Sequence, residues 1–308
     1  MNDKVALLMG GWSAEREISL KSGGAVLSAL QRSGIDVEAI DVDRNIVNRL
    51  RGGDFQRAFN MLHGRDGEDG TVQALLELLE IPYTGSGVAA CAIAMDKMRS
   101  KMLWQAARLP TPKAQMAYSE SDCESILDTC QLPFAVKPVL EGSSVGITKV
   151  KTAEQLSPAW HDAQRYGEVM VEEWIEGKEY TVAVLDGEPL PSIRLQPARE
   201  FYDYVAKYDD DNTQYHCPSG LSVEQEQEIQ QLCIEAFSAL GCSGWGRVDL
   251  MLDDNSEPWL IEVNTVPGMT DHSLVPMAAK AAGIEFDELV LRILAGASLK
   301  AGGDADAC

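Results

Sequence analysis

The sequence is short of positive charge. Its 308 residues include 26 Lys and Arg against 48 Asp and Glu, which gives a formal net charge of −22. Such a chain repels nucleic acid and anionic membranes, so we expect no binding to either. A site for a phosphate-bearing ligand would need Lys and Arg side chains gathered locally. We hypothesise that the acidic excess reflects tolerance of high salt.

Long apolar runs and paired cysteines are also missing. No apolar stretch approaches the ~20 residues of a membrane-spanning helix, and the one at the N-terminus is too short for a signal peptide. The seven cysteines are odd in number and include no C-x-x-C pair, which argues against a disulfide framework or a zinc site. We therefore expect a cytoplasmic protein with reduced thiols, long enough for two or three domains.

Two common nucleotide-binding motifs, G-x-G-x-x-G and G-x-x-x-x-G-K-[ST], are absent. The first strand and helix, expected at Val5–Met9 and Ala14–Leu30, therefore lack the dinucleotide fingerprint. A Gly/Ser loop, KPVLEGSSVG at residues 137–146, lies between two expected strands. Its backbone N–H groups could hold phosphate, and an ordinary hairpin is the alternative.

What the sequence does contain is a pair of strands near its end. Residues 247–252 and 259–264 alternate polar and apolar side chains, and the residues between them are polar. Symmetric closure of this hairpin over residues 255 and 256 places Leu252 opposite Trp259. The apolar residues then share one face of the sheet, namely Val248, Leu250, Ile261 and Val263.

The same register gathers polar residues on the other face, with Arg247 opposite Asn264 and Asp249 opposite Glu262. Two carboxylates directly opposite each other repel, and a cation between them removes that penalty. Carboxylate and amide oxygens suit magnesium that is held jointly with substrate phosphates. The pattern predicts a metal site, and a solvated sheet face is the alternative.

Apolar periodicity predicts further elements in the first part of the chain. Strands are expected at 36–41 and 57–62, and the second strand runs into HGRDGEDGT and a helix at 72–80. His63 then lies at the end of a strand, where α/β sheets gather ligands, although a structural role is the alternative. One helix is predicted over 95–107, with a stripe of methionines toward the core and Lys97 on the opposite face.

The segment 194–220 shows neither helical nor strand periodicity. It is rich in aromatic residues, which is typical of a lid or binding loop rather than of disorder. Helices are expected at 222–240 and 286–295. The tail 298–308 is expected to be disordered.

Seven motifs occur in order along the whole chain: GGWSAEREIS, HGRDGEDG, MDK at 95–97, KPVLEGSSVG, YDYVAKY, GWGRVDLM and EVNTVPGMTDHSLVP. Together they resemble the bacterial D-alanine–D-alanine ligase family of the ATP-grasp superfamily. The resemblance implies an α/β protein with a three-domain ATP-grasp fold, in which a Rossmann-like N-terminal domain precedes two sheets that clamp ATP. The implied domains are 1–94, 95–177 with the Gly/Ser loop, and 178–308 with an ω-type lid and the metal site.

The resemblance also implies roles in binding the nucleotide and metals. The two phosphate-binding lysines are matched by Lys97 and Lys137. The adenine-binding strand is matched by Glu172, Glu173, Trp174 and Ile175, and the ribose-contacting acid by Glu179. Two magnesium ions, with manganese as the alternative, are implied at Asp249, Glu262 and Asn264.

For the amino-acid substrates, the resemblance implies that Glu15 holds the ammonium group of the first D-alanine. Ser143 and Tyr208 would be linked to Glu15 by hydrogen bonds. Arg247 and the backbone N–H of Gly268 would form an oxyanion site. The carboxylate of the second D-alanine is matched to two further residues, Lys207 and Ser273.

The implied function is the ATP-dependent joining of two D-alanine molecules through D-alanyl phosphate, for peptidoglycan precursors, by a homodimer. Ligases that join D-alanine to D-lactate or D-serine share nearly all these motifs and are one alternative. The tyrosine at 208 favours the dipeptide ligase, because depsipeptide-forming relatives usually lack it. A nucleotide-binding relative without catalysis is another alternative, which the intact Arg247, Asp249 and Glu262 disfavour. A ligase for another acid acceptor is the third.

Overall fold

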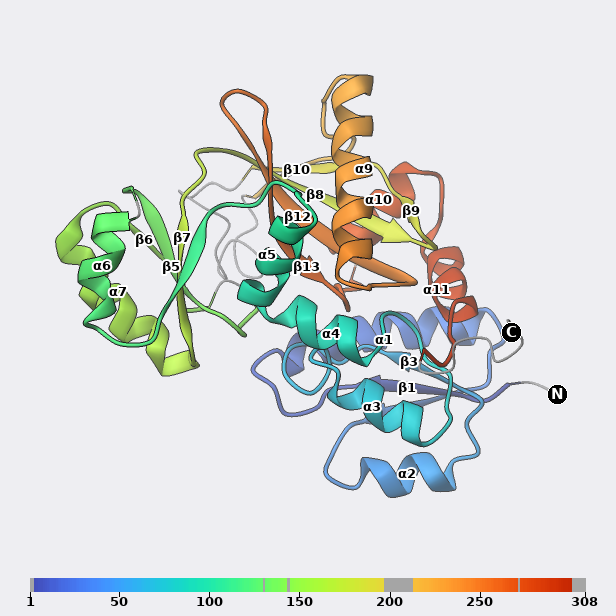
Figure 1. Cartoon of the computed structure of the whole chain (residues 1–308). Coiled ribbons are helices and arrows are strands. Elements are labelled where there is room, and N and C mark those ends of the chain that lie inside the picture. Colours follow the sequence, from blue (N-terminus) through green and yellow to red (C-terminus); the bar gives the residue numbers. More distant parts are fainter. Residues whose placement is uncertain (1–2, 130, 143–144, 197–212, 271, 301–308) are drawn as a thin grey trace, which may run out of the picture.

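The structure, a computed structural model, describes residues 3–129, 131–142, 145–196, 213–270 and 272–300. Three β-sheets follow one another along the chain, with three, four and six strands. Figure 1 shows the first sheet at the bottom, the second at the left and the third at the upper centre. Within the described ranges, no helix has both the length and the apolar character needed to cross a membrane.

The first sheet is parallel, with the strand order β2-β1-β3. Each strand is followed by a helix that returns the chain to the end of the sheet where the strand began. The next strand therefore runs in the same direction. The elements expected in this region are confirmed, with small displacements of their ends. Their bounds are β1 (Val5–Met9), α1 (Arg16–Arg32), β2 (Val37–Asp41), α2 (Ile46–Gly52), β3 (Arg57–Asn60) and α3 (Thr71–Leu78).

Two helices, α4 (Val88–Met95) and α5 (Lys97–Ala106), replace the single helix predicted over 95–107. Asp96 separates them, because its backbone is extended and its carboxylate accepts the backbone N–H of Arg99 at 2.8 Å. This contact is an N-cap, which satisfies one of the free N–H groups at the start of α5.

The buried face of α5 is the reverse of the prediction. It carries Lys97, Ser100, Lys101 and Trp104, whereas Met102 is 58% exposed. The predicted methionine stripe toward the core is therefore wrong, although Lys97 does lie on the opposite face from Met102. The lysines turn inward because acidic side chains of the second and third sheets lie there to pair with them.

The second sheet is antiparallel, with the order β4-β7-β5-β6. It has a core of its own, in which Phe134, Val136, Trp160 and Val171 are buried. Figure 1 shows its two helices on the side turned away from the third sheet. The bounds are β4 (Ala114–Ala117), α6 (Asp122–Thr129), β5 (Phe134–Pro138), β6 (Thr148–Val150), η1 (Ala153–Gln155), α7 (Leu156–Ala163), η2 (Gln164–Tyr166) and β7 (Val169–Glu173).

The third sheet follows the order β11-β10-β8-β12-β13, with β9 paired to β8. The helices predicted at 222–240 and 286–295 are confirmed as α9 and α11. The bounds are β8 (Gly177–Leu185), β9 (Glu188–Pro189), β10 (Ile193–Gln196), β11 (Gln214–His216), α9 (Val223–Ala239), β12 (Trp245–Asp253), β13 (Pro258–Asn264), α10 (Leu274–Ala281) and α11 (Phe286–Ala295).

Two expectations for aperiodic segments change. The ends of the segment 194–220 form strands β10 and β11, which pair with each other, while residues 197–212 lie outside the described residues. The start of the tail is ordered, because the backbone N–H of Ser298 donates to Tyr83 O at 3.1 Å and that of Lys300 donates to Glu77 at 2.7 Å. Residues 301–308 also lie outside the described residues.

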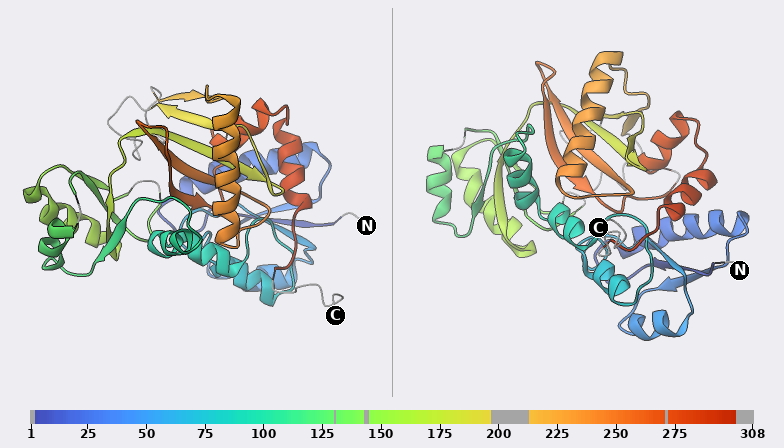
Figure 2. Two further views of the ribbon diagram at one scale, coloured as in Figure 1. Left: turned by 45° about the horizontal axis from the view of Figure 1, so that its top comes forward. Right: turned by 45° about the vertical axis from the view of Figure 1, so that its right-hand side comes forward.

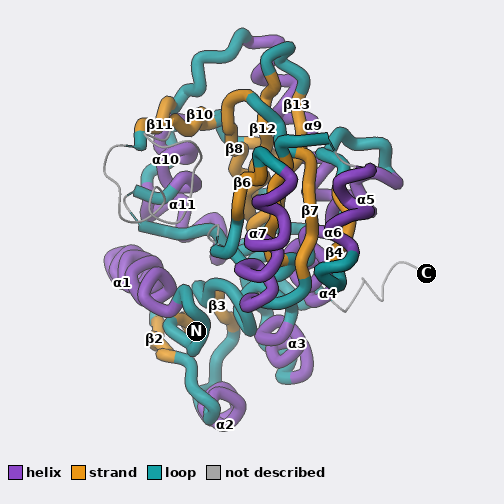
Figure 3. The backbone as a smooth tube through the Cα atoms, turned by 90° about the vertical axis from the view of Figure 1, so that its left-hand side faces the viewer, coloured by secondary structure: helices purple, strands orange, loops and turns teal. Residues whose placement is uncertain are grey.

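The first and third sheets share one hydrophobic core. Leu7 and Phe59 of the first sheet belong to the same buried cluster as Trp245 of β12 and Val290 of α11. Figures 2 and 3 show α1 beside α11, where Arg32 forms an ion pair with Asp287. The second sheet has a separate core, and Lys101 of α5 reaches it through an ion pair with Glu172.

The hairpin of β12 and β13 departs from the predicted symmetric closure. A β-bulge between Asp249 and Leu250 shifts the register by one residue, so Trp259 lies opposite Met251 and not opposite Leu252. As a result Leu260 is fully buried, while Ile261 is only half-buried. The bulge bends the strand beyond the polar pairs and leaves the pairs themselves in the predicted register.

Candidate active site between the second and third sheets

The polar face of β12 and β13 forms one wall of the site. Arg247 lies opposite Asn264 and Asp249 opposite Glu262, as predicted. Arg247 donates to both oxygens of Asp249, from Nε at 2.8 Å and from Nη2 at 2.7 Å. Thr181 on β8 donates to Asp249 Oδ1 at 2.6 Å. These contacts offset the cost of burying the Asp249 carboxylate, which is 7% exposed.

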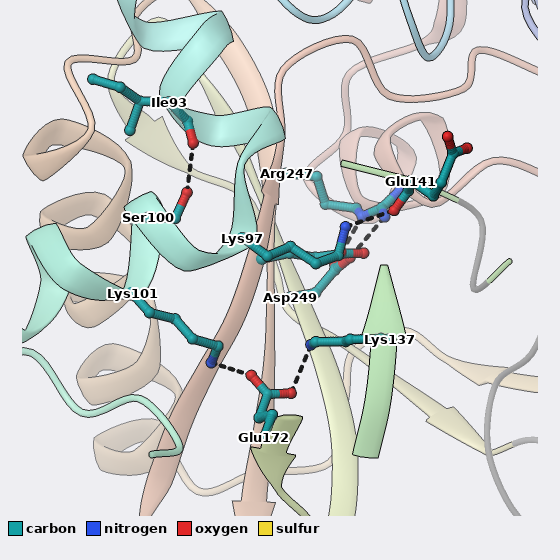
Figure 4. A network of polar contacts seen from close by, with 10 residues as sticks. Ile93, Lys97, Ser100, Lys101, Lys137, Glu141, Glu172, Arg247 and Asp249 are labelled. Atoms are coloured by element: carbon teal, nitrogen blue, oxygen red, sulfur yellow. Dashed lines mark hydrogen bonds and ion pairs between the residues drawn. The ribbon is translucent and has the colours of Figure 1, made fainter. Parts of the chain in front are cut away.

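Lys97 approaches this wall from α5. Its Nζ lies 3.3 Å from Glu262 Oε2 and donates to the carbonyl oxygen of Glu141 at 2.7 Å. Figure 4 shows the Lys97 side chain pointing toward the Arg247–Asp249 pair. The buried ammonium of Lys97 and the guanidinium of Arg247 can together attract an anionic ligand. They supply the local positive charge that a phosphate site requires in this acidic chain.

The oxygen donors on this wall fit a hard divalent cation. Asp249 and Glu262 are carboxylates on neighbouring strands, and Asn264 adds an amide oxygen, which accepts the backbone N–H of Val266 at 3.2 Å. The described part of the chain contains no group of three or more His, Cys, Asp and Glu side chains arranged for a metal. Magnesium does not require such a group, because it is commonly held by one or two carboxylates together with substrate phosphates.

A second buried cluster lies on the side of the second sheet. Lys137 of β5 donates from Nζ to Glu172 Oε2 of β7 at 2.6 Å, and Lys101 of α5 pairs with the other carboxylate oxygen (Figure 4). Burial opposes the ionisation of Glu172, but the two ammonium groups overcome it and lower the pKa of its carboxyl group. Burial also lowers the pKa of Lys101 to about 8, an effect that Glu172 opposes and Lys137 reinforces.

The other residues predicted to contact the nucleotide line the crossing from β7 to β8. Glu173 is exposed at the end of β7, and Trp174 and Ile175 are half-buried in the link between the sheets. Lys149 Nζ lies 4.4 Å from the centre of the Trp174 ring, which is a cation–π contact. Glu179 follows on β8, opposite Met251. The structure therefore brings these residues to the junction of the second and third sheets.

Glu15 lies at the start of α1, where loops from two sheets meet. A Cβ atom at Gly64 would lie 2.5 Å from Glu15 Oε2, and one at Gly142 would lie 3.4 Å from both carboxylate oxygens. Gly64 follows β3, and Gly142 belongs to the Gly/Ser loop after β5. The fold thus places the predicted ammonium-binding carboxylate against the predicted phosphate loop.

Two titratable groups beside Glu15 come from the HGRDGEDG segment. Burial, with the Glu15 charge adding to it, raises the pKa of Glu68 to about 8, and its Oε2 accepts the Gly64 N–H at 2.5 Å. Burial also lowers the pKa of His63, whose Nε2 lies 3.4 Å from Ser22 Oγ. From the sequence, His63 could have either a ligand-binding or a structural role. In the structure it is a buried group next to the site.

Gly268 and Ser273 lie together after β13. A Cβ atom at Gly268 would lie 2.9 Å from Ser273 Oγ, so a larger residue there would displace the serine hydroxyl. Ser273 Oγ also accepts the backbone N–H of Thr270 at 2.9 Å, just before α10 begins. Three further predicted site residues, Ser143, Lys207 and Tyr208, lie outside the described residues.

Sequence reasoning missed Lys101 and Glu68. The spacing of Lys97 and Lys101, four residues apart on one helix, places both on the same face and was a usable signal. Glu68 gave a weaker signal, because a carboxylate in a polar loop reads as exposed. Only the packing of that loop against Glu15 and the third sheet makes it half-buried and desolvates its carboxylate.

The arrangement of these sheets is that of an ATP-grasp fold, as predicted. A D-alanine–D-alanine ligase from Bacillus anthracis, described as complexed with ATP, has a TM-score of 0.85 at 31% identity, covering 96% of this chain and 97% of that one. VanG D-Ala:D-Ser ligase from Enterococcus faecalis also has a TM-score of 0.85, at 30% identity, covering 96% of this chain and 99% of that one.

Sequence comparison goes further than the fold. The family "D-ala D-ala ligase C-terminus" matches residues 103–295, and "D-ala D-ala ligase N-terminus" matches residues 48–86. A D-alanine–D-alanine ligase from Ectopseudomonas mendocina (strain ymp) is 56% identical over 293 residues, which are 95% of this chain and 94% of the relative. The chain belongs to the D-alanine–D-alanine ligase family.

Proposed function

We propose that this protein joins two D-alanine molecules to D-alanyl-D-alanine at the expense of ATP, for peptidoglycan precursor synthesis. The observation that carries the proposal is its 56% identity to a D-alanine–D-alanine ligase over nearly its whole length. The site geometry supports it, because Lys97, Arg247 and the facing carboxylates Asp249 and Glu262 lie together in one network of contacts. The D-serine ligase resembles this chain in fold at lower identity, so D-alanine is the favoured second substrate.

The chemistry needs activation of a carboxylate. A carboxylate oxygen of the first D-alanine attacks the γ-phosphorus of ATP, ADP leaves, and D-alanyl phosphate forms. The second D-alanine, once its ammonium has lost a proton, attacks the acyl carbon with its amine. The nitrogen then gives up its surplus proton, the tetrahedral oxyanion collapses and the bond to phosphate breaks. The dipeptide is released with inorganic phosphate, which can accept that proton.

Each site residue has its own role in these two steps. Lys97 and Lys137 neutralise the phosphates during transfer, since catalysis of phosphoryl transfer is mostly positioning and electrostatic stabilisation. Arg247 and the Gly268 N–H stabilise the oxyanion of the second step. Glu15 binds the ammonium of the first D-alanine, and Ser273 binds the carboxylate of the second.

Asp249, Glu262 and Asn264 would hold two magnesium ions, or manganese in their place. When bound, these ions neutralise charge on the transferring phosphoryl group. Their oxygen donors, two carboxylates and one amide, support this assignment. The domain limits 1–94, 95–177 and 178–308, the homodimer and the cytoplasmic location belong to the same proposal.

The test is phosphate release from Mg-ATP with D-alanine alone, beside L-alanine alone and D-alanine with either D-lactate or D-serine, with the product mass recorded. We expect phosphate and a D-alanyl-D-alanine mass with D-alanine alone. Turnover only with a different second substrate would retain the ATP-dependent ligase and overturn the dipeptide assignment. Inertness in every mixture would overturn the proposal.

A further inference from the structure

A chain of buried polar contacts joins the second and third sheets through Lys101. From β13 of the third sheet, Leu260 O accepts a hydrogen bond from Thr111 Oγ1 at 2.8 Å. Lys101 Nζ lies 2.8 Å from the same Thr111 oxygen and forms an ion pair with Glu172 of the second sheet. Lys137 Nζ completes the chain at 2.6 Å from Glu172 Oε2. One ammonium thus contacts groups attached to both sheets, and Figure 4 shows its contact with Glu172.

The third-sheet end of this chain is firmly held. The segment that follows α5 adds a backbone contact beside the Thr111 hydroxyl, in which Leu260 N–H donates to Pro110 O at 2.9 Å. Trp104, one helical turn after Lys101, donates from Nε1 to Ala236 O at 3.0 Å. Helix α5 is therefore anchored to the third sheet and its core, and Lys101 reaches from it to the second sheet.

The charges in this cluster do not balance. Lys101 is 0% exposed, Lys137 3% and Glu172 4%, so two buried cations share one buried carboxylate. A buried charge without a partner is costly, whereas a shared carboxylate can lose one of its two partners and stay compensated. The surplus positive charge lies at the end of β5, where the Gly/Ser loop begins.

We propose that Lys101 is a positioning residue, which keeps Glu172 fixed and paired so that Lys137 can leave that carboxylate for a nucleotide phosphate. This inference rests on the proposed function, because it takes ATP as the phosphate ligand. Without Lys101, release of Lys137 would strand the Glu172 carboxylate in a buried position. Lys137 would then stay with Glu172, and nucleotide binding would weaken.

The experiment is a double-mutant cycle of Lys101→Met and Glu172→Gln in the full-length protein. Methionine fills the space of the lysine stem without its charge. We expect Lys101→Met to raise the KM for ATP and the Kd of a fluorescent ADP analogue by about tenfold, with a smaller change in the KM for D-alanine. In the Glu172→Gln background the same substitution should have little effect, because no carboxylate remains to retain Lys137.

If Lys101 had only a structural role, its replacement would lower the Tm and leave the nucleotide Kd unchanged. Removing one partner of a buried ion pair usually destabilises a protein, because the other charge is left uncompensated. Here Glu172 keeps Lys137 as a partner, so we expect the Tm of Lys101→Met to stay close to that of the wild type. The matched control is Trp104→Phe on the same helix, which should lower the Tm and leave the nucleotide Kd unchanged. A Lys101→Met protein with lowered Tm and unchanged Kd would overturn the inference, and so would an equal effect in both Glu172 backgrounds.

The Kd measurement keeps this inference separate from the proposed function. A wild-type protein that binds the ADP analogue but makes no dipeptide would overturn the substrate assignment and leave the role of Lys101 to be judged by the cycle. A wild-type protein that binds no ADP analogue at millimolar concentration would overturn both.

Discussion

Arg247 combines an observed contact with a proposed role. Its guanidinium holds both oxygens of Asp249, and its position on the polar face of β12 suits the oxyanion role. A bidentate pair fixes the guanidinium in one orientation, which is what an oxyanion donor requires before the reaction starts.

Replacement of Arg247 by alanine should therefore act on the chemical step. We expect Arg247→Ala to lower kcat by about 10²-fold or more, the scale for losing an oxyanion donor, while the Kd of ADP changes little. The measurement is steady-state turnover beside nucleotide binding. Near-normal turnover would remove Arg247 from the oxyanion site.

Glu68 should make stability depend on pH. Its carboxyl group has an ordinary pKa of 4.5, which burial raises to about 8, so the folded chain retains a proton that the unfolded chain releases. The associated stability is fully present below pH of about 4.5 and is lost as the pH rises to about 8. Glu68→Gln mimics the protonated form and removes this dependence.

We accordingly expect the Tm of the wild type to fall relative to that of Glu68→Gln as the pH is raised from about 5.5 to 8, by about 2–4 °C for each kcal/mol lost. Thermal unfolding of both proteins at several pH values measures the difference. A Tm difference that does not change across this window would show that Glu68 is ionised in the folded protein.

At the scale of single elements, α1 illustrates how packing sets the identity of neighbouring residues. Gly23 and Gly24 are adjacent on this helix, but a Cβ at Gly23 would lie 2.5 Å from the Met9 sulfur, whereas one at Gly24 would meet nothing within 4 Å. Gly23 thus permits the close approach of α1 to β1, and Gly24 has no such role.

The two glycines should respond oppositely to alanine. Gly24→Ala should stabilise the protein by about 0.5–1 kcal/mol, because alanine is the better helix former. Gly23→Ala should destabilise it by roughly 1–3 kcal/mol through overpacking against Met9. Urea unfolding of both variants is the measurement, and a stabilising Gly23→Ala would contradict the packing argument.

At the scale of the whole molecule, the hydrophobic cores are confined to particular sheets, whereas electrostatic repulsion acts on all of them. The first and third sheets share one core, and the second sheet has its own. The negative charge, by contrast, acts on all three, because 48 acidic residues face only 26 basic ones. Their mutual repulsion opposes the compact state and is screened by salt.

Raising the salt concentration should therefore stabilise the molecule. We expect the Tm to rise by on the order of 5 °C between 0.1 and 1 M NaCl, because the Debye length shortens from about 10 Å to 3 Å. Turnover should be retained over the same range if the acidic excess reflects salt tolerance. A Tm that falls with NaCl would contradict the repulsion argument.

Several features of this protein followed from the sequence alone. Local signals predicted the βα units of the first sheet, the helices at 222–240 and 286–295 and the polar pairs of β12 and β13, because each depends on the spacing of neighbouring residues. The ordered motifs also predicted the ligase family, since they preserve residue identities that packing alone does not demand.

Other features were decided only by the tertiary structure. The inward turn of Lys97 and Lys101 depends on carboxylates of the second and third sheets, and the partial burial of Glu68 depends on the segments that pack over it. The bulge after Asp249 likewise replaces Ile261 with Leu260 in the core. In each case the partner lies far away in the chain, so the free energy that selects the conformation arises from contacts that local sequence patterns do not specify.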